Sequence, residues 1–138
     1  MNEASSSPTA EPRRFAHRVL VVDDHPLMRR SLVEALEREP DFIVCGQAGD
    51  VPEGLAAVAS LLPDVVLTDL QLKTSSGLDL IRQMQTNMPG LPVVATTMFD
   101  VHRNERLARA AGAAAFSAKQ DGPEKLIATL RQVLSARQ

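Results

Sequence analysis

Acidic, hydroxyl and basic side chains of this sequence stand directly after short apolar runs, where separate segments of a folded chain can meet. Asp23 and Asp24 follow the run RVLVV, and Asp69 follows the run VVLT. Thr97 and Lys119 follow two later apolar runs. Phosphoryl transfer depends mostly on positioning the phosphoryl group and neutralising its charge. Carboxylates, a hydroxyl and an ammonium group can do both.

The elements that must position these side chains alternate along the chain. Apolar runs predict strands buried on both faces, and apolar residues at helical spacing predict helices between them. The predicted strands are 18–22, 42–47, 65–68, 91–96 and 114–118, and the predicted helices start at Pro26, after an N-cap at Asp50, beyond Gly77, at Asp100 and at Pro123. Such alternation predicts a parallel sheet with right-handed crossovers and helices on both faces. Ligands bind at the carboxyl ends of the strands in such sheets, so the carboxylates converge if the first and third strands are neighbours.

Several local features of the elements can be predicted. The second helix should carry an apolar stripe and end at Pro63; the stripe is Leu55, Val58, Ala59 and Leu62. Gly112 should close the fourth helix in the left-handed conformation. Thr96 should face away from Asp69, because neighbouring residues of a strand point to opposite faces.

The clustered carboxylates predict a cation. Three carboxylates in one pocket repel one another, and a hard divalent ion relieves that repulsion. An oxygen ligand set without a Cys or His set favours Mg²⁺ over Zn²⁺. Asp69 is then the candidate nucleophile, Lys119 a positive charge for a phosphate oxygen, and Thr97 a hydrogen-bonding hydroxyl. We expect a structural or surface role for His25, because one histidine among carboxylates makes no zinc set.

The segments VLVVDDHP, PDVVLTDL with Gly77 beyond it, VVATTMFD and AAGAAAFSAKQ resemble the receiver domains of response regulators, the CheY-like superfamily. They are most similar to receivers of LuxR/NarL-type two-component regulators. The resemblance covers about residues 18–136. It implies an α/β, flavodoxin-like (βα)5 three-layer sandwich whose five-stranded parallel sheet has the order 2-1-3-4-5. Residues 17–138 would form the receiver domain, and residues 1–16 a flexible tail.

The same resemblance assigns roles to the site residues. Asp69 would be the phosphoacceptor, catalysing only its own phosphorylation and dephosphorylation with Lys119. Mg²⁺ would be bound directly by Asp24 and Asp69 and by the backbone carbonyl of Gln71, and largely through water by Asp23.

The resemblance also implies a signalling mechanism and partners. The phosphodonor would be a phosphohistidine on a sensor histidine kinase or a histidine phosphotransfer protein. Thr97 and Phe116 would form a switch that alters the surface of the fourth helix and fifth strand. Control of transcription is the expected output. A homodimer that forms on phosphorylation is left open.

The composition of the chain bears on its binding partners and its cellular location. The chain has 138 residues, 44% of them hydrophobic, and a formal net charge of -2, which argues against direct nucleic-acid binding. Cys45 is the only cysteine and no run is long enough to span a bilayer, so we expect a cytoplasmic protein outside the membrane. LuxR-type regulators continue into a helix-turn-helix domain, so this chain is either a stand-alone receiver or one from which a DNA-binding domain is missing.

The same residues also bear on three other functions and on one purely structural role. A nucleotide-binding domain would need a Gly-rich turn where this chain has Asp-Asp-His-Pro. A Mg²⁺-dependent phosphatase would usually carry its nucleophile and a second acid after the first strand. A pseudo-receiver that binds partners without phosphate stays open as the alternative. Asp23 and Asp24 could also serve merely as caps of the following helix.

Overall fold

The computed structural model describes residues 15–136, so most of the predicted tail at residues 1–16 lies outside the described residues. The strands are β1 (His17–Val22), β2 (Phe42–Ala48), β3 (Val65–Asp69), β4 (Val93–Thr97) and β5 (Ala115–Ala118). The helices are α2 (Pro26–Glu37), α3 (Val51–Leu61), α4 (Gly77–Asn87), α5 (Val101–Ala111) and α6 (Pro123–Ala136), with a short 3-10 helix η1 (Lys119–Asp121) after β5. Each predicted strand and helix is present within a residue or two of its predicted bounds.

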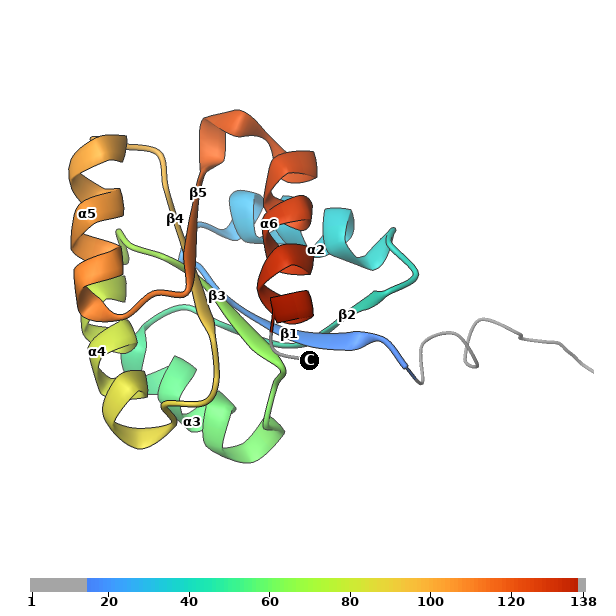
Figure 1. The fold of residues 1–138 in the computed structure, drawn as a ribbon, viewed down its shortest axis with the longest axis horizontal. Helices are drawn as coiled ribbons and strands as arrows, with labels where there is room; N and C mark the ends of the chain where they lie inside the picture. The colour runs from blue at the N-terminus through green and yellow to red at the C-terminus, as the bar shows by residue number, and fades with distance from the viewer. Residues whose placement is uncertain (1–14, 137–138) are drawn as a thin grey trace, which may run out of the picture.

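The strands form one parallel sheet in the order β2-β1-β3-β4-β5. In Figure 1, α2 and α6 cover one face of this sheet, and α3, α4 and α5 cover the other. The chain therefore has the predicted flavodoxin-like three-layer sandwich, with the predicted strand order.

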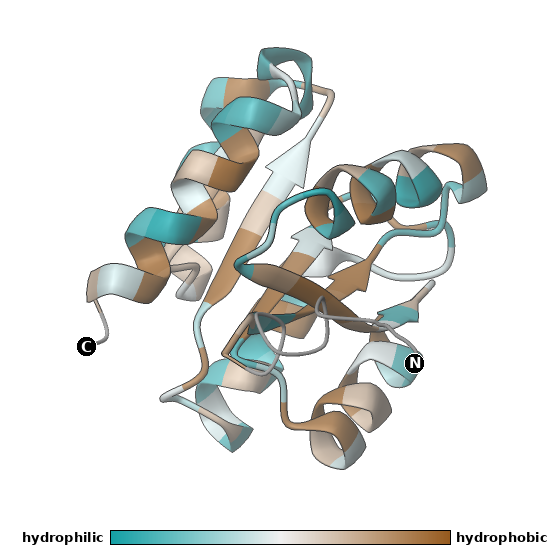
Figure 2. Ribbon diagram, turned by 90° about the vertical axis from the view of Figure 1, so that its right-hand side faces the viewer, coloured by the Kyte–Doolittle hydropathy of each residue, from teal (hydrophilic) through white to brown (hydrophobic). Residues whose placement is uncertain are grey.

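The core has two halves, one on each face of the sheet. Within β1, Val19 and Val21 pack under α2 and α6, whereas Leu20 and Val22 pack under α3 and α4. Figure 2 shows the result, because the strands are brown along most of their length and the helices carry teal faces outward. Burial on both faces is why the strands are continuous apolar runs and do not alternate with polar residues.

The apolar stripe predicted for α3 is partly wrong. The helix buries Val51, Gly54 and Val58, whereas Leu62 lies beyond its end, exposed and left-handed with φ of 50°. The sequence between Val51 and Leu62 is apolar almost all round the helix, so its spacing does not select one face. Pro63 ends the helix as predicted, because the residue before a proline is disfavoured in the α conformation.

Two glycines are required by the backbone near the helices. Gly112 ends α5 with φ of 117°, as predicted, and its N–H donates to the carbonyls of Ala108 and Arg109. Gly77 begins α4 so close to the end of β3 that an added Cβ would lie 2.2 Å from the carbonyl oxygen of Asp69. Only glycine fits there, so Gly77 lets α4 pack beside the Asp69 backbone.

None of the helices within residues 15–136 combines the length and the apolar character needed to cross a bilayer.

Candidate functional site

The site lies where the connections leaving the sheet reverse direction. The chain passes from β1 to β2 on one side, and β3 lies on the other side of β1. Asp23 and Asp24 follow β1, Asp69 is the last residue of β3, and Lys119 follows β5 directly. All four therefore stand at the carboxyl edge of the sheet, where open α/β sheets bind ligands.

Lys119 bridges two of the three carboxylates. Its Nζ lies 2.8 Å from Oδ2 of Asp23 and 2.9 Å from Oδ2 of Asp69. The side chains of all three residues are at most 5% exposed. A buried charge is costly unless it is paired and hydrogen-bonded, and this arrangement meets both conditions for Lys119.

Burial and pairing shift the titration of this bridge. Burial raises the pKa of Asp69 above its usual range, and hydrogen bonds from Lys119 and the Gln71 N–H offset part of that rise. Burial alone would lower the pKa of Lys119, but its hydrogen bonds to Asp23 and Asp69 outweigh burial and raise it. Lys119 therefore stays cationic at neutral pH, and its single ammonium group bridges the carboxylates of Asp23 and Asp69.

Asp24 is the third carboxylate of the site, and it is not bridged by Lys119. Its Oδ2 accepts a hydrogen bond from the backbone N–H of Lys73. Its Oδ1 is buried and has no hydrogen-bond partner among the described residues. An orphaned carboxylate oxygen beside two more carboxylates suits a hard cation that takes oxygen ligands, so these residues fit Mg²⁺. Asp24, Asp23 and Asp69 would supply its protein ligands.

His25, for which a structural or surface role is predicted, lies against all three carboxylates of the acidic cluster. Its Nδ1 is 3.0 Å from Asp23 Oδ1, 3.1 Å from Asp24 Oδ1 and 3.5 Å from Asp69 Oδ2, although 53% of the side chain is exposed. His25 is also the N-cap residue of α2, and it makes no side-chain cap hydrogen bond. Neither Asp23 nor Asp24 is the N-cap, so a purely capping role for the pair is wrong.

The predicted switch residues lie on the side of the sheet covered by α3, α4 and α5. The hydroxyl of Thr97 donates to the side-chain carbonyl of Gln71 and accepts from the Phe99 N–H at 3.2 Å. Within residues 15–136, this hydroxyl makes its hydrogen bonds to Gln71 and Phe99 and none to Asp69. Phe116 is half-buried and packs against the core on this face. Gln71 joins the two regions, because its backbone N–H donates to Asp69 Oδ1 at 3.0 Å.

The orientation predicted for Thr96 is wrong. Asp69 and Thr96 are directly paired in the β3–β4 register, so their side chains leave the same face of the sheet. Thr96 in turn pairs with Ser117 of β5, and both hydroxyls are buried without a hydrogen-bond partner among the described residues. Counting along one strand cannot reveal this, because the register with the neighbouring strand decides which residues share a face.

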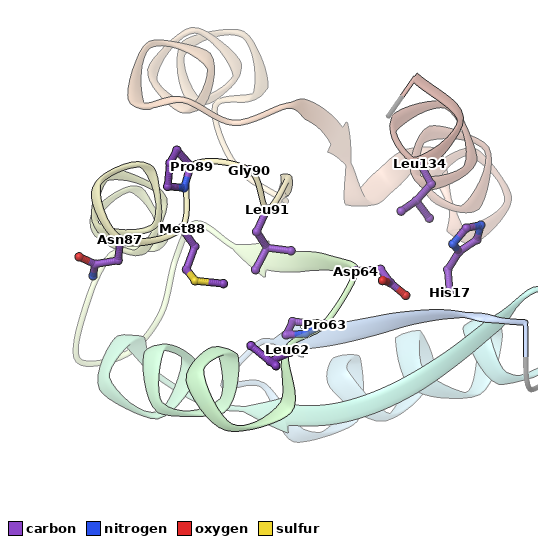
Figure 3. Close-up of a pocket in the computed structure, with 10 residues that line it drawn as sticks. All are labelled: His17, Leu62, Pro63, Asp64, Asn87, Met88, Pro89, Gly90, Leu91 and Leu134. Atoms are coloured by element: carbon purple, nitrogen blue, oxygen red, sulfur yellow. The ribbon is translucent and has the colours of Figure 1, made fainter. Parts of the chain in front are cut away.

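Two cavities lie at opposite ends of the sheet. A cavity of about 490 Å³ borders the site and is lined in part by Asp24, Asp69, Lys119 and Phe99. A larger one of about 570 Å³ lies at the opposite, amino-terminal end of the strands. Figure 3 shows it between His17, Asp64, Met88 and Leu134. Of these two cavities, only the first is lined by both the clustered carboxylates and Lys119, so it is the candidate functional site.

Comparison with known proteins adds independent evidence. The family model of the response regulator receiver domain matches residues 19–131. The DNA-binding transcriptional activator DevR/DosR of Mycobacterium tuberculosis is 32% identical over 120 residues, which are 87% of this chain and 55% of that protein. The nitrate/nitrite response regulator protein NarP of Escherichia coli is also 32% identical over 120 residues, which are 87% of this chain and 56% of that protein.

A solved structure agrees with these sequence matches. The two-component response regulator of the LuxR family from Aurantimonas sp. superposes with a TM-score of 0.84 at 27% identity. The match covers 89% of this chain and 88% of that chain. This chain spans about half the length of the curated relatives DevR/DosR and NarP.

Proposed function

The chain belongs to the response regulator receiver domain family of two-component signalling, and on that premise we propose that it accepts a phosphoryl group on Asp69. The observation that carries the proposal is the Lys119 bridge. A buried ammonium group within 2.9 Å of the Asp69 carboxylate stands ready to neutralise the charge of an incoming phosphoryl group. The adjacent acidic pair supplies the ligands for Mg²⁺.

In the proposed reaction, a carboxylate oxygen of Asp69 attacks the phosphorus of a phosphohistidine. The phosphorus–nitrogen bond of the donor breaks, a phosphorus–oxygen bond to Asp69 forms, and the histidine leaves with the bonding electron pair. The Gln71 N–H orients the carboxylate through its Oδ1, and Lys119 neutralises charge on the transferred group. Mg²⁺, when bound by Asp23, Asp24, Asp69 and the Gln71 carbonyl, supplies further charge neutralisation.

Thr97 and Phe116 would convert this local charge into a change of surface. The Thr97 hydroxyl is engaged by Gln71 and Phe99, and a phosphoryl group on Asp69 would offer it a charged acceptor instead. Phe116 lies one strand away, half-buried, and would follow into the space behind Thr97. The surface of α5 and β5 is then the output face, a two-state element biased by a new charge.

The partners proposed are those of the family. The donor is a sensor histidine kinase or a histidine phosphotransfer protein, and phosphorylation favours a homodimer through the output face. The output is control of transcription, which the description of DevR/DosR as a DNA-binding transcriptional activator supports. The receiver itself contacts no DNA in this proposal, and its only chemistry is on its own Asp69.

The first test is phosphorylation by a small donor. The protein is incubated with Mg²⁺ and acetyl phosphate, and its intact mass is measured beside Asp69→Asn and the matched surface control Asp79→Asn. We expect one added phosphoryl group on the parent protein and on Asp79→Asn, lost when a chelator is present. We expect none on Asp69→Asn.

A second arm separates the receiver from the pseudo-receiver. Beryllofluoride with Mg²⁺ mimics a phosphoryl group on a carboxylate without any transfer chemistry, so it should shift the NMR signals around Asp69. An adduct that persists on Asp69→Asn would contradict the assignment of the acceptor. If the parent protein neither gains mass nor binds beryllofluoride, it is a phosphate-independent binding module.

A further inference from the structure

The imidazole of His25 stands among the carboxylates at the spacing of ligand atoms around one metal ion. Its Nδ1 is 3.0, 3.1 and 3.5 Å from one oxygen each of Asp23, Asp24 and Asp69. Adjacent ligands at right angles around an ion with bonds of about 2.1 Å are about 3.0 Å apart. Nδ1 therefore lies at the distance of a neighbouring ligand from oxygens of Asp23 and Asp24.

The backbone holds His25 in this place. Its N–H donates to Asp23 Oδ1 at 2.9 Å, and Pro26 directly after it begins α2. Proline fixes its own φ and restricts the residue before it to extended conformations, and His25 has φ of -96° and ψ of 105°. The ring is thus presented to the cluster by a restrained turn. One ligand atom each from Asp23, Asp24 and His25 lie within 4.8 Å of one another.

A second observation points to a ligand inside the cluster. Asp24 has a side chain only 10% exposed, and its Oδ1 has no hydrogen-bond partner among residues 15–136. This oxygen is the one that lies 3.1 Å from His25 Nδ1. A buried carboxylate oxygen rarely lacks a hydrogen bond, so Asp24 Oδ1 and the neighbouring His25 Nδ1 are both suited to bind a cation.

We propose that His25 is a nitrogen ligand of this metal site, so that the site binds imidazole-preferring divalent ions such as Ni²⁺ and Co²⁺ with His25 coordinated. The inference rests on the proposed function in that it uses the same carboxylate pocket. Mg²⁺ prefers oxygen ligands and gains little from an imidazole, whereas Ni²⁺ and Co²⁺ gain a favoured ligand. Coordination through Nδ1 leaves the ring proton on Nε2.

The rival interpretation is a purely structural His25. The ring is also within hydrogen-bond distance of Asp23 Oδ1, and that contact alone would help to fix the turn into α2. A structural imidazole would change the stability of the protein when it is removed, but it would not change which metal the pocket prefers. The ratio of Ni²⁺ affinity to Mg²⁺ affinity therefore separates the two interpretations.

The test is isothermal titration of Ni²⁺ and, separately, Mg²⁺ into the full chain, His25→Ala and the control His102→Ala. His102 is an exposed histidine in the first turn of α5 and does not line the site cavity. We expect His25→Ala to lower the ratio of Ni²⁺ to Mg²⁺ affinity by about tenfold or more, as loss of metal-site contacts typically does. His102→Ala should leave that ratio unchanged. An unchanged ratio in His25→Ala overturns the proposal.

A measurement without any substitution covers the case in which His25→Ala fails to fold. Co²⁺ is added to the parent protein, and the ring-proton NMR signals of its histidines are followed. We expect the Nε2 proton of His25 to show the contact shift that only a bond between Co²⁺ and the ring nitrogen transmits, and no such shift for His102. If the His25 ring shows only the dipolar shifts that a nearby, unbonded Co²⁺ causes, the proposal is also overturned.

Failure of the proposed metal ligand and failure of phosphoacceptance can be told apart. Failure of the proposed function is the absence of a Mg²⁺-dependent adduct on Asp69 in the parent protein. Failure of the present inference is an unchanged metal preference in His25→Ala, or a His25 ring without a contact shift, in a protein that still gains the adduct.

Discussion

Thr68 and Thr96 are buried on neighbouring strands, and they differ in whether the side-chain hydroxyl makes a hydrogen bond. Thr68 Oγ1 donates to the Asp69 carbonyl at 3.0 Å, whereas Thr96 Oγ1 has no hydrogen-bond partner among the described residues. Valine has nearly the same shape as threonine without the hydroxyl. Thr68→Val should therefore cost about 1 kcal/mol of unfolding free energy, and Thr96→Val should be neutral or stabilise by about 1 kcal/mol. Urea unfolding of both variants beside the parent protein measures the difference.

The opposite result for Thr96 would also be informative. A cavity of about 100 Å³ borders Thr96, Ser117 and Lys119, and it has room for water. If Thr96→Val costs as much as Thr68→Val, the Thr96 hydroxyl is satisfied by a water molecule in that cavity, and the prediction is wrong.

At this scale the sequence predicted which residues meet, but not all of their contacts. Asp23, Asp69 and Lys119 converge as predicted, because each stands at the end of a strand. The roles given to Thr97 and to the Gln71 carbonyl stay predictions. The position of His25 and the orientation of Thr96 depend on a turn geometry and on a sheet register, and spacing along one segment carries neither.

At the scale of elements, the close approach of α4 to the end of β3 depends on Gly77. A Cβ at Gly77 would lie 2.2 Å from the Asp69 carbonyl oxygen and 2.8 Å from the Leu70 Cα, which are backbone atoms that cannot rotate away. Gly77→Ala should therefore cost about 1–3 kcal/mol, the usual range for forced overpacking. It should also slow phosphorylation, because the Asp69 backbone must move.

Gly90 is the matched control for that substitution. It lies in the turn after α4, its φ is not in the left-handed region, and an added Cβ would meet nothing within 4 Å. Gly90→Ala should change stability by no more than about 0.5 kcal/mol. Thermal unfolding and the acetyl-phosphate mass assay compare the two variants, and equal effects would rule out close packing at Gly77 as the cause.

The types and order of the elements could be predicted because apolar runs and helical spacing alternate without a break. The buried face of α3 could not, because Leu55, Ala59 and Leu62 are as apolar as the residues that the helix buries. There the packing against β1 and α4 selects the face, and those contacts involve residues far away in the sequence.

At the scale of the whole molecule, Arg131 of α6 ties the last helix to the loop before β2. Its guanidinium makes two hydrogen bonds of 2.8 Å to Asp41 and one of 2.7 Å to Glu39, and it lies 5.6 Å above the ring of Phe42. Arg131→Ala should cost about 1 kcal/mol, because exposed ion pairs contribute little individually. Arg109→Ala, which removes an exposed pair within α5, should cost less.

The contribution of Arg131 to the free energy of unfolding should decrease in acid. The hydrogen bond from Arg131 is the largest cause that lowers the pKa of Asp41 below its usual value of about 3.9. A carboxyl with a lowered pKa in the folded state stabilises the protein above its unfolded pKa. That stability is lost as pH falls through the lowered value. The difference between Arg131→Ala and the parent protein should be full at pH 7 and shrink below about pH 4, and a difference that grows in acid would contradict the assignment.

The architecture of the whole molecule followed from the order of its elements, and the strand order followed from the resemblance to receivers. Alternating strands and helices admit few topologies, because parallel crossovers are right-handed. The tie between α6 and the β2 loop had no signal in the sequence. Arg131 and Asp41 are separated by 90 residues, and neither stands in a pattern that marks the other.

Lys119 comes to the acidic cluster from the last strand of the chain, 96 residues after Asp23 and 50 after Asp69. When the chain has left the ribosome only as far as β4, Asp23 and Asp69 are already outside it. Lys119, the cation that bridges them, is not. Those carboxylates repel each other until β5 adds to the edge of the sheet. The bridge between Asp23 and Asp69 is therefore completed only when β5 has joined the sheet, after every other strand has left the ribosome.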